Sequence, residues 1–104
     1  MAQISTDVAS SVDRFLVALR LRKQVDMAYL YGSQAGGRAT EWSDIDIAVV
    51  SAGFSDDMFE ERLALMRLAA EIDDRIEPSP FTPETFNAGA PLASEIIRTG
   101  VRVA

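Results

Sequence analysis

Residues 32–46 read Gly-Ser-Gln-Ala-Gly-Gly-Arg-Ala-Thr-Glu-Trp-Ser-Asp-Ile-Asp. Apolar runs lie on both sides of this segment, at 27–31 and 47–50, and predict two strands joined by a connection that begins with a glycine turn. Side chains alternate between the faces of a strand, so Asp44 and Asp46 point the same way with Cα atoms about 6.5 to 7 Å apart. The segment therefore directs two carboxylates to one place.

This acid pair predicts a metal site. Two carboxylates at this distance repel each other and resist desolvation unless a cation joins them. Magnesium takes oxygen ligands and commonly combines one or two protein carboxylates with the phosphates of a substrate. Gly32 lets the backbone approach a phosphate closely, and the amides at the start of a following helix can donate to it.

Composition narrows the classes of function. The chain has 104 residues, enough for one core, so we expect a single domain over 1–104 without a separate substrate domain. It contains no cysteine and no histidine, which excludes disulfides, thiolate zinc sites and nucleophiles activated by histidine. Its net charge of −6 argues against unaided binding to duplex nucleic acid.

The sequence gives no sign of a membrane protein. It has no apolar run near the roughly 18 residues that span a bilayer, and its N-terminus lacks a basic segment followed by an apolar one. We therefore expect a cytoplasmic location and no membrane partner.

The rest of the chain predicts alternating helices and strands. Prolines at 78 and 80 would confine a third strand to an edge of the sheet, and Thr82-Pro83 has the form of a helix start. The expected helices are 5–23, 55–74 and 91–99 with a short one within 34–38, and the expected strands are 26–31, 44–50, 75–80 and 101–103.

Two helices have distinct apolar faces. In the first, Val8, Val12, Phe15, Leu16 and Leu19 recur at helical spacing after the candidate caps Ser5 and Thr6. In the helix at 55–74 we expect Ser55 as the cap, one apolar stripe, and an apolar face wide enough to contact both the sheet and a partner. That stripe comprises Phe59, Leu63, Met66 and Ala70, and the residues that widen it are Leu65, Leu68 and Ile72.

Other phosphate and metal motifs do not fit the sequence. It has no Gly-Lys-Ser/Thr for a P-loop, residues 32–37 lack the dinucleotide-binding glycine spacing, and an EF-hand would need an oxygen ligand at Ala48 and glycine at Val49.

With Gly-Ser, ten residues, then Asp-any-Asp, the chain resembles the minimal nucleotidyltransferases of the DNA polymerase β superfamily. The order of elements resembles that family over nearly the whole chain, and in particular the MNT protein of two-gene HEPN/MNT toxin-antitoxin systems. The resemblance implies an α/β (α+β) nucleotidyltransferase fold, a small mixed sheet with helices packed on it. It also implies magnesium-dependent transfer of a nucleotide from ATP or another NTP.

The resemblance also assigns roles to residues. Gly32 and Ser33 would cradle the triphosphate, and Asp44 and Asp46 would hold two metal ions. Glu77 matches the third carboxylate, which is usually aspartate in the family, and is the alternative to Asp46 as base. Arginines that often follow the Gly-Ser pair are replaced by Gln34 and Gly36, which leaves Arg38 as the nearest cation.

Two further residues lie just before the acid pair. Ser43 could contact a phosphate or begin the strand, and both readings stand equal. Trp42 could stack on a base or touch a partner, but a single tryptophan is more often a packing residue, which is our prediction.

Three functions are compatible with the sequence. The leading one is an antitoxin that transfers AMP from ATP to a hydroxyl of a partner protein, a helical HEPN toxin. The alternative is a weakly active or inactive binding module that neutralises its partner by occlusion, and nucleotide transfer to a small molecule ranks third. Assembly with itself or with another protein stays open.

Overall fold

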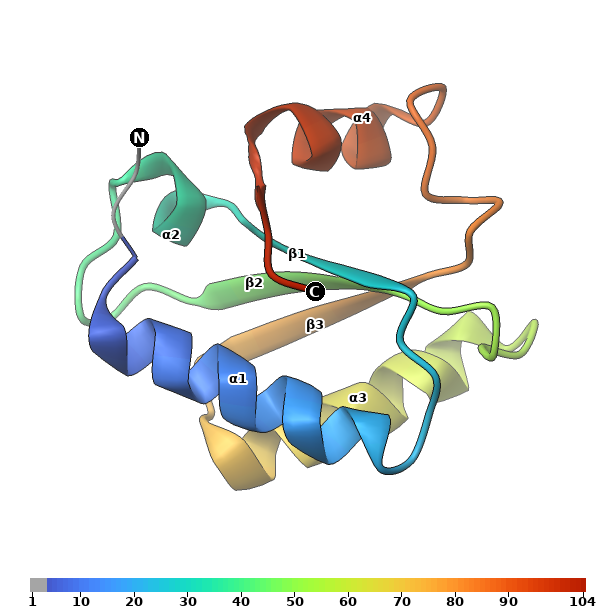
Figure 1. Cartoon of the computed structure of the whole chain (residues 1–104), viewed down its shortest axis with the longest axis horizontal. Coiled ribbons are helices and arrows are strands. Elements are labelled where there is room, and N and C mark those ends of the chain that lie inside the picture. The colour runs from blue at the N-terminus through green and yellow to red at the C-terminus, as the bar shows by residue number, and fades with distance from the viewer. Residues whose placement is uncertain (1–3) are drawn as a thin grey trace.

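The computed structural model describes residues 4–104, where four helices surround one four-stranded sheet (Figure 1). No helix in this part of the chain has both the length and the apolarity needed to cross a membrane. The elements in chain order are α1 (Thr6–Arg20), β1 (Met27–Tyr31), α2 (Ser33–Gly36), β2 (Ile45–Val50), α3 (Met58–Ile72), β3 (Ile76–Phe81), α4 (Pro91–Thr99) and β4 (Val101–Arg102).

The sheet is mixed, as predicted. Its strand order is β3-β2-β1-β4, with β1 antiparallel to both β2 and β4 and β2 parallel to β3. Pro78 and Pro80 therefore lie on an edge strand, which confirms the expectation drawn from their missing amide donors.

Helices cover both faces of the sheet. In Figure 1, α1 and α3 lie on one face and α4 lies on the other. Ile45 and Ile47 of β2 are fully buried against the α1 and α3 side, whereas Ala48 and Val50 belong to a second cluster with Phe86 and residues of α4. The predicted face of α1 is confirmed, because Val8, Val12, Phe15, Leu16 and Leu19 are all buried there.

The start of α3 differs from the prediction. Asp57, not Ser55, caps this helix by accepting from the amide of Glu60, while the Ser55 hydroxyl accepts from the amide of Asp57. A carboxylate next to the first turn is also the stronger acceptor for a helix N-terminus.

The predicted stripe of α3 is also wrong. Phe59 and Met66 are 70% and 40% exposed. The helix packs instead through Leu65 and Leu68, which were predicted only to widen the stripe, together with Ala69. Both sets recur at helical spacing, so periodicity alone could not choose the face that packs on the sheet.

The segment after β3 forms a single turn and no helix. Thr82 accepts from the amides of Thr85 and Phe86, and the helical pattern stops there. The ring of Phe86 then packs against Tyr29 and Phe81, with centroids 5.4 and 5.1 Å apart. The buried ring thus anchors this turn against the sheet.

Ion pairs fix the point where β3 begins. Arg75 donates to Asp73 at 2.7 Å and to Asp7 at 2.8 Å, and the hydroxyl of Ser11 donates to Asp73 at 2.7 Å. The carbonyl of Arg75 in turn accepts from the amide of Ile45, at the start of the β2–β3 pairing. This network therefore helps to set the register between the two strands.

Candidate active site

The predicted acids lie on or next to two neighbouring strands of the sheet. In the strand register Asp46 of β2 lies opposite Tyr31 of β1 and Glu77 of β3. Ile45 and Ile47 point into the α1 and α3 core, so alternation places Asp46 on the α4 side. Asp44 directly precedes β2, one residue outside the strand that was predicted to include it.

The acids influence one another electrostatically. Partial burial raises the pKa of the Asp46 carboxyl above its ordinary value, and the negative charges of Asp44 and Glu77 raise this pKa further. All three effects disfavour the charged carboxylate. A bound cation would offset the repulsion among these negative charges.

Gly32 presses against the same carboxylate. Its φ of +74° and ψ of −147° belong to a region that only glycine adopts readily. A Cβ atom at this position would also lie 2.5 Å from Oδ2 of Asp46, closer than any real contact. Only glycine therefore fits at position 32, because of both its backbone dihedral angles and its short distance to the Asp46 carboxylate.

The donor chemistry fits a hard divalent ion. Within residues 4–104 no three acidic side chains already converge as a complete ligand set. However, Asp44, Asp46 and Glu77 present only oxygen donors, and such a partial carboxylate set leaves positions for water and phosphate oxygens, as magnesium requires. These residues would hold the ions that the resemblance implies.

Arg38 lies over the glycine turn. A Cβ atom on Gly36 would come within 2.6 to 2.9 Å of three guanidinium atoms of Arg38. The guanidinium therefore fills the space that a side chain at position 36 would need, and Gly36 makes room for it. Arg38 also lines a cavity together with Gly32, so two of the four predicted nucleotide-binding residues border the same space.

The other predicted residues shape the connection. Ser43 accepts from the amide of Thr40 at 2.9 Å, so its hydroxyl closes a loop turn. The carbonyl of Ser33 accepts from the amide of Arg38, and the buried amide of Gln34 donates to the carbonyl of Asp44 at 3.3 Å. These bonds tie the turn to the acid pair.

Trp42 does not pack inside the domain. Its side chain is 84% exposed, so the prediction of a packing residue is wrong. It belongs to the connection between α2 and β2.

Sequence reasoning did not single out Tyr31. It is the register partner of Asp46, and its hydroxyl lies 3.2 Å from that of Ser79 on β3. The phenol therefore reaches across β2 on the face that carries the acids. Alternation along 27–31 predicts its orientation within the strand, but the strand pairing that brings it to Asp46 is not visible in the sequence.

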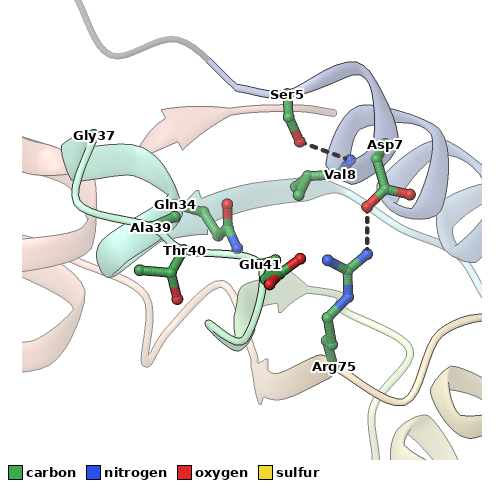
Figure 2. Close-up of a pocket in the computed structure, with 9 residues that line it drawn as sticks. All are labelled: Ser5, Asp7, Val8, Gln34, Gly37, Ala39, Thr40, Glu41 and Arg75. Carbon is green, nitrogen blue, oxygen red and sulfur yellow. Dashed lines mark hydrogen bonds and ion pairs between the residues drawn. The ribbon is translucent and has the colours of Figure 1, made fainter.

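A larger cavity lies away from the acids (Figure 2). It has a volume of about 350 Å³ between the start of α1 and the connection after α2, and its lining includes Asp7, Glu41 and Arg75. None of the three site acids lines it, and its arginine is already paired with Asp7 and Asp73. The sheet face that carries Asp46 is therefore a better candidate for the active site than this cavity.

The comparison with protein families agrees with this geometry. Residues 17–104 match the family described as polymerase beta, nucleotidyltransferase. The chain belongs to this nucleotidyltransferase family. The match includes the Gly-Ser turn and all three acids, which lie within those residues.

A solved structure shows the same fold. A Sulfolobus solfataricus protein described as a "putative nucleotidyltransferase" superposes with a TM-score of 0.52 at 19% identity, over 91% of this chain and 72% of its own. No curated protein sequence matches the chain. The family and the fold are thus shown, and a transferase activity of this general type with an NTP substrate follows from the family.

Proposed function

We propose that this nucleotidyltransferase uses magnesium to transfer AMP from ATP to a hydroxyl of a helical HEPN-type partner protein, and that the transfer neutralises that partner as an antitoxin would. The observation that carries the proposal is the placement of Asp46 between Glu77 and the Gly32 turn. The pKa of the Asp46 carboxyl is raised, and the backbone next to it belongs to a glycine. A metal-bound triphosphate needs such a carboxylate for the metal and an open backbone for the phosphates.

Each residue has a defined task in this scheme. Asp44 and Asp46 would hold two magnesium ions, with Glu77 as the third carboxylate. Such ions neutralise phosphate charge and lower the pKa of an attacking hydroxyl. Gly32 and Ser33 would bind the triphosphate along the turn. Other residues would neutralise its charge and accept the proton of the acceptor hydroxyl.

Arg38 and Ser43 belong to the connection that faces the triphosphate. Arg38 supplies positive charge in a chain whose net charge is −6. Ser43 stabilises the turn of the connection by accepting from the amide of Thr40. Glu77 or Asp46 takes the proton of the acceptor hydroxyl. No described residue offers a histidine for this task, since the chain has none.

An exposed aromatic side chain beside the acids supports a protein acceptor. Trp42 lies two residues before Asp44 in the chain, and its side chain is 84% exposed. A large aromatic side chain left in solvent next to the site offers apolar area that another protein can contact. We propose a cytoplasmic complex in which the partner brings the acceptor hydroxyl to the acid face.

A labelling experiment tests the proposal. The protein would be mixed with ATP labelled on the α-phosphate, magnesium and a cognate helical partner, and the label would be followed on the partner. Asp46→Asn should abolish transfer. Asp56→Asn removes the same charge from the exposed segment before α3 and should leave transfer intact.

The outcomes separate transfer from occlusion. If the complex forms but no label reaches the partner, the proposal is wrong. If a double Asp44→Asn, Asp46→Asn variant still neutralises the partner fully, the protein works by covering it. Transfer of label to a small hydroxylated compound, with none on the partner, would assign the third function.

A further inference from the structure

A second cavity adjoins the Gly32 turn on the α4 side of the sheet. Its volume is about 240 Å³, and its walls come from the end of β1, the turn around α2, and α4. Pockets for drug-sized ligands are commonly about 300 to 1,000 Å³, so this one suits part of a nucleotide rather than all of it.

The lining of this cavity combines two kinds of chemistry. The turn contributes Gly32 and the cationic side chain of Arg38, which suit an anion. Helix α4 contributes the aliphatic side chains of Leu92 and Ile96, and Tyr31 packs against the cluster that contains Ile96. A ligand that fills it would carry negative charge at one end and a flat apolar group at the other.

Tyr31 connects this cavity to the acids. Its hydroxyl is held by Ser79 at 3.2 Å, so the ring is fixed in direction, and its backbone pairs with Asp46. A ring held in this way can support a planar group by stacking. The carboxylate of Glu95 also lines the cavity and would repel a phosphate placed at the α4 end.

We propose that this cavity holds the nucleoside of the NTP, with its base between Tyr31 and α4 and its phosphates directed toward Arg38 and Gly32. The inference rests on the proposed function and adds the part of the site that selects the substrate. Glu95 offers only acceptor oxygens, so it favours a base that presents an amino group.

Two matched variants of α4 test this assignment. Leu92 is 53% exposed and lines the cavity, whereas Ile97 is 41% exposed on the same helix and does not. The probes are an ATP analogue with a methylene bridge between its α and β phosphates, and inorganic tripolyphosphate, each with magnesium in a calorimeter. Leu92→Ser should weaken the nucleotide analogue by about five- to tenfold and leave tripolyphosphate unchanged, because only apolar contact is lost. Ile97→Ser should change neither.

Each result has one meaning. If the wild-type protein binds neither probe, the proposed function itself fails. If it binds both and Leu92→Ser matches Ile97→Ser, the proposed function stands and the cavity assignment is overturned. If Leu92→Ser weakens both probes equally, the cavity holds phosphate, which also overturns the assignment.

A measurement on the wild-type protein needs no variant. Photolabelling with 8-azido-ATP and magnesium, followed by peptide mass spectrometry, should place the label on Tyr31 or on residues 92–99. A label confined to the cavity of Figure 2 would overturn the proposal.

Discussion

Replacement of Asp46 by asparagine should stabilise the magnesium-free protein while it removes the activity. Asp46 lies two residues from Asp44 and directly opposite Glu77 in the sheet. Two unit charges about 6 Å apart repel by about 0.7 kcal/mol in a water-like medium, and salt screens part of this energy. The two repulsions together with partial burial give a gain of about 1 kcal/mol in the free energy of unfolding at pH 7.

The pH dependence of this gain has a definite sign. The folded protein raises the pKa of Asp46 above its ordinary value of 3.8, so ionisation of this carboxyl disfavours the folded state. Below about pH 3.8 the carboxyl is protonated in both states, and wild type and variant should be equally stable. The difference should appear as the pH rises through the raised pKa and then stay constant.

Thermal unfolding with and without magnesium measures the effect. In chelator, a gain of about 1 kcal/mol should raise the Tm of Asp46→Asn by about 4 to 8 °C for a domain of this size. Magnesium and ATP analogue at about ten times their dissociation constant should stabilise only the wild type, by about 1.4 kcal/mol, and so reverse the order. Asp56→Asn is the control for the removed charge.

Two results would refute this reasoning. The first is a Tm of Asp46→Asn in chelator that lies below that of the wild type while Asp56→Asn is unchanged. The second is a variant that gains as much stability from magnesium and nucleotide as the wild type does.

Three further substitutions follow from the structure. Gly32→Ala should lower the free energy of unfolding by about 1 to 3 kcal/mol in chemical denaturation and abolish transfer, whereas Gly37→Ala, also at φ +74° but in the ordinary left-handed region, should keep the activity. Glu77→Gln should reduce kcat in the transfer assay by about a hundredfold or more, and Glu77→Asp should keep most of it; equal loss in both would remove the role of base. Arg75→Met should lower the free energy of unfolding by about 1 to 3 kcal/mol at pH 7, since Arg75 holds the pKa of Asp73 well below 3.8, and the deficit should shrink as the pH falls below that value and Asp73 protonates in the unfolded chain.

The sequence predicted the order of elements because local signals were strong. The prolines of β3 put that strand at an edge, as observed. Alternation predicts Asp44 and Asp46 on one face, and Asp44 lies one residue before the strand that carries Asp46. The centre of the α3 face was predicted wrongly, because Phe59 and Leu65 both fit a helical period and only packing against the sheet decides between them.

Contacts between distant segments could not be predicted in the same way. The cavity beside Gly32 needs α4, which follows almost 60 residues later in the chain. The pairing of Tyr31 with Asp46 depends on strand register, which turn chemistry and buried faces fix together. The site acids were visible as a motif, whereas the residues that surround a substrate were not.

The site acids lower the stability of the fold that positions them. Burial and like charge destabilise ionised Asp46, and Gly32 is held in a conformation that other residues avoid. The opposing contribution lies at the start of the same strand pair, where Arg75 binds Asp73 and its carbonyl receives the amide of Ile45. That network fixes the register two residues before Glu77, so it stabilises the very alignment that the repulsion would loosen. We therefore expect Arg75→Met to reduce nucleotide binding as well as stability, and full binding in a folded Arg75→Met protein would show that the register is set elsewhere.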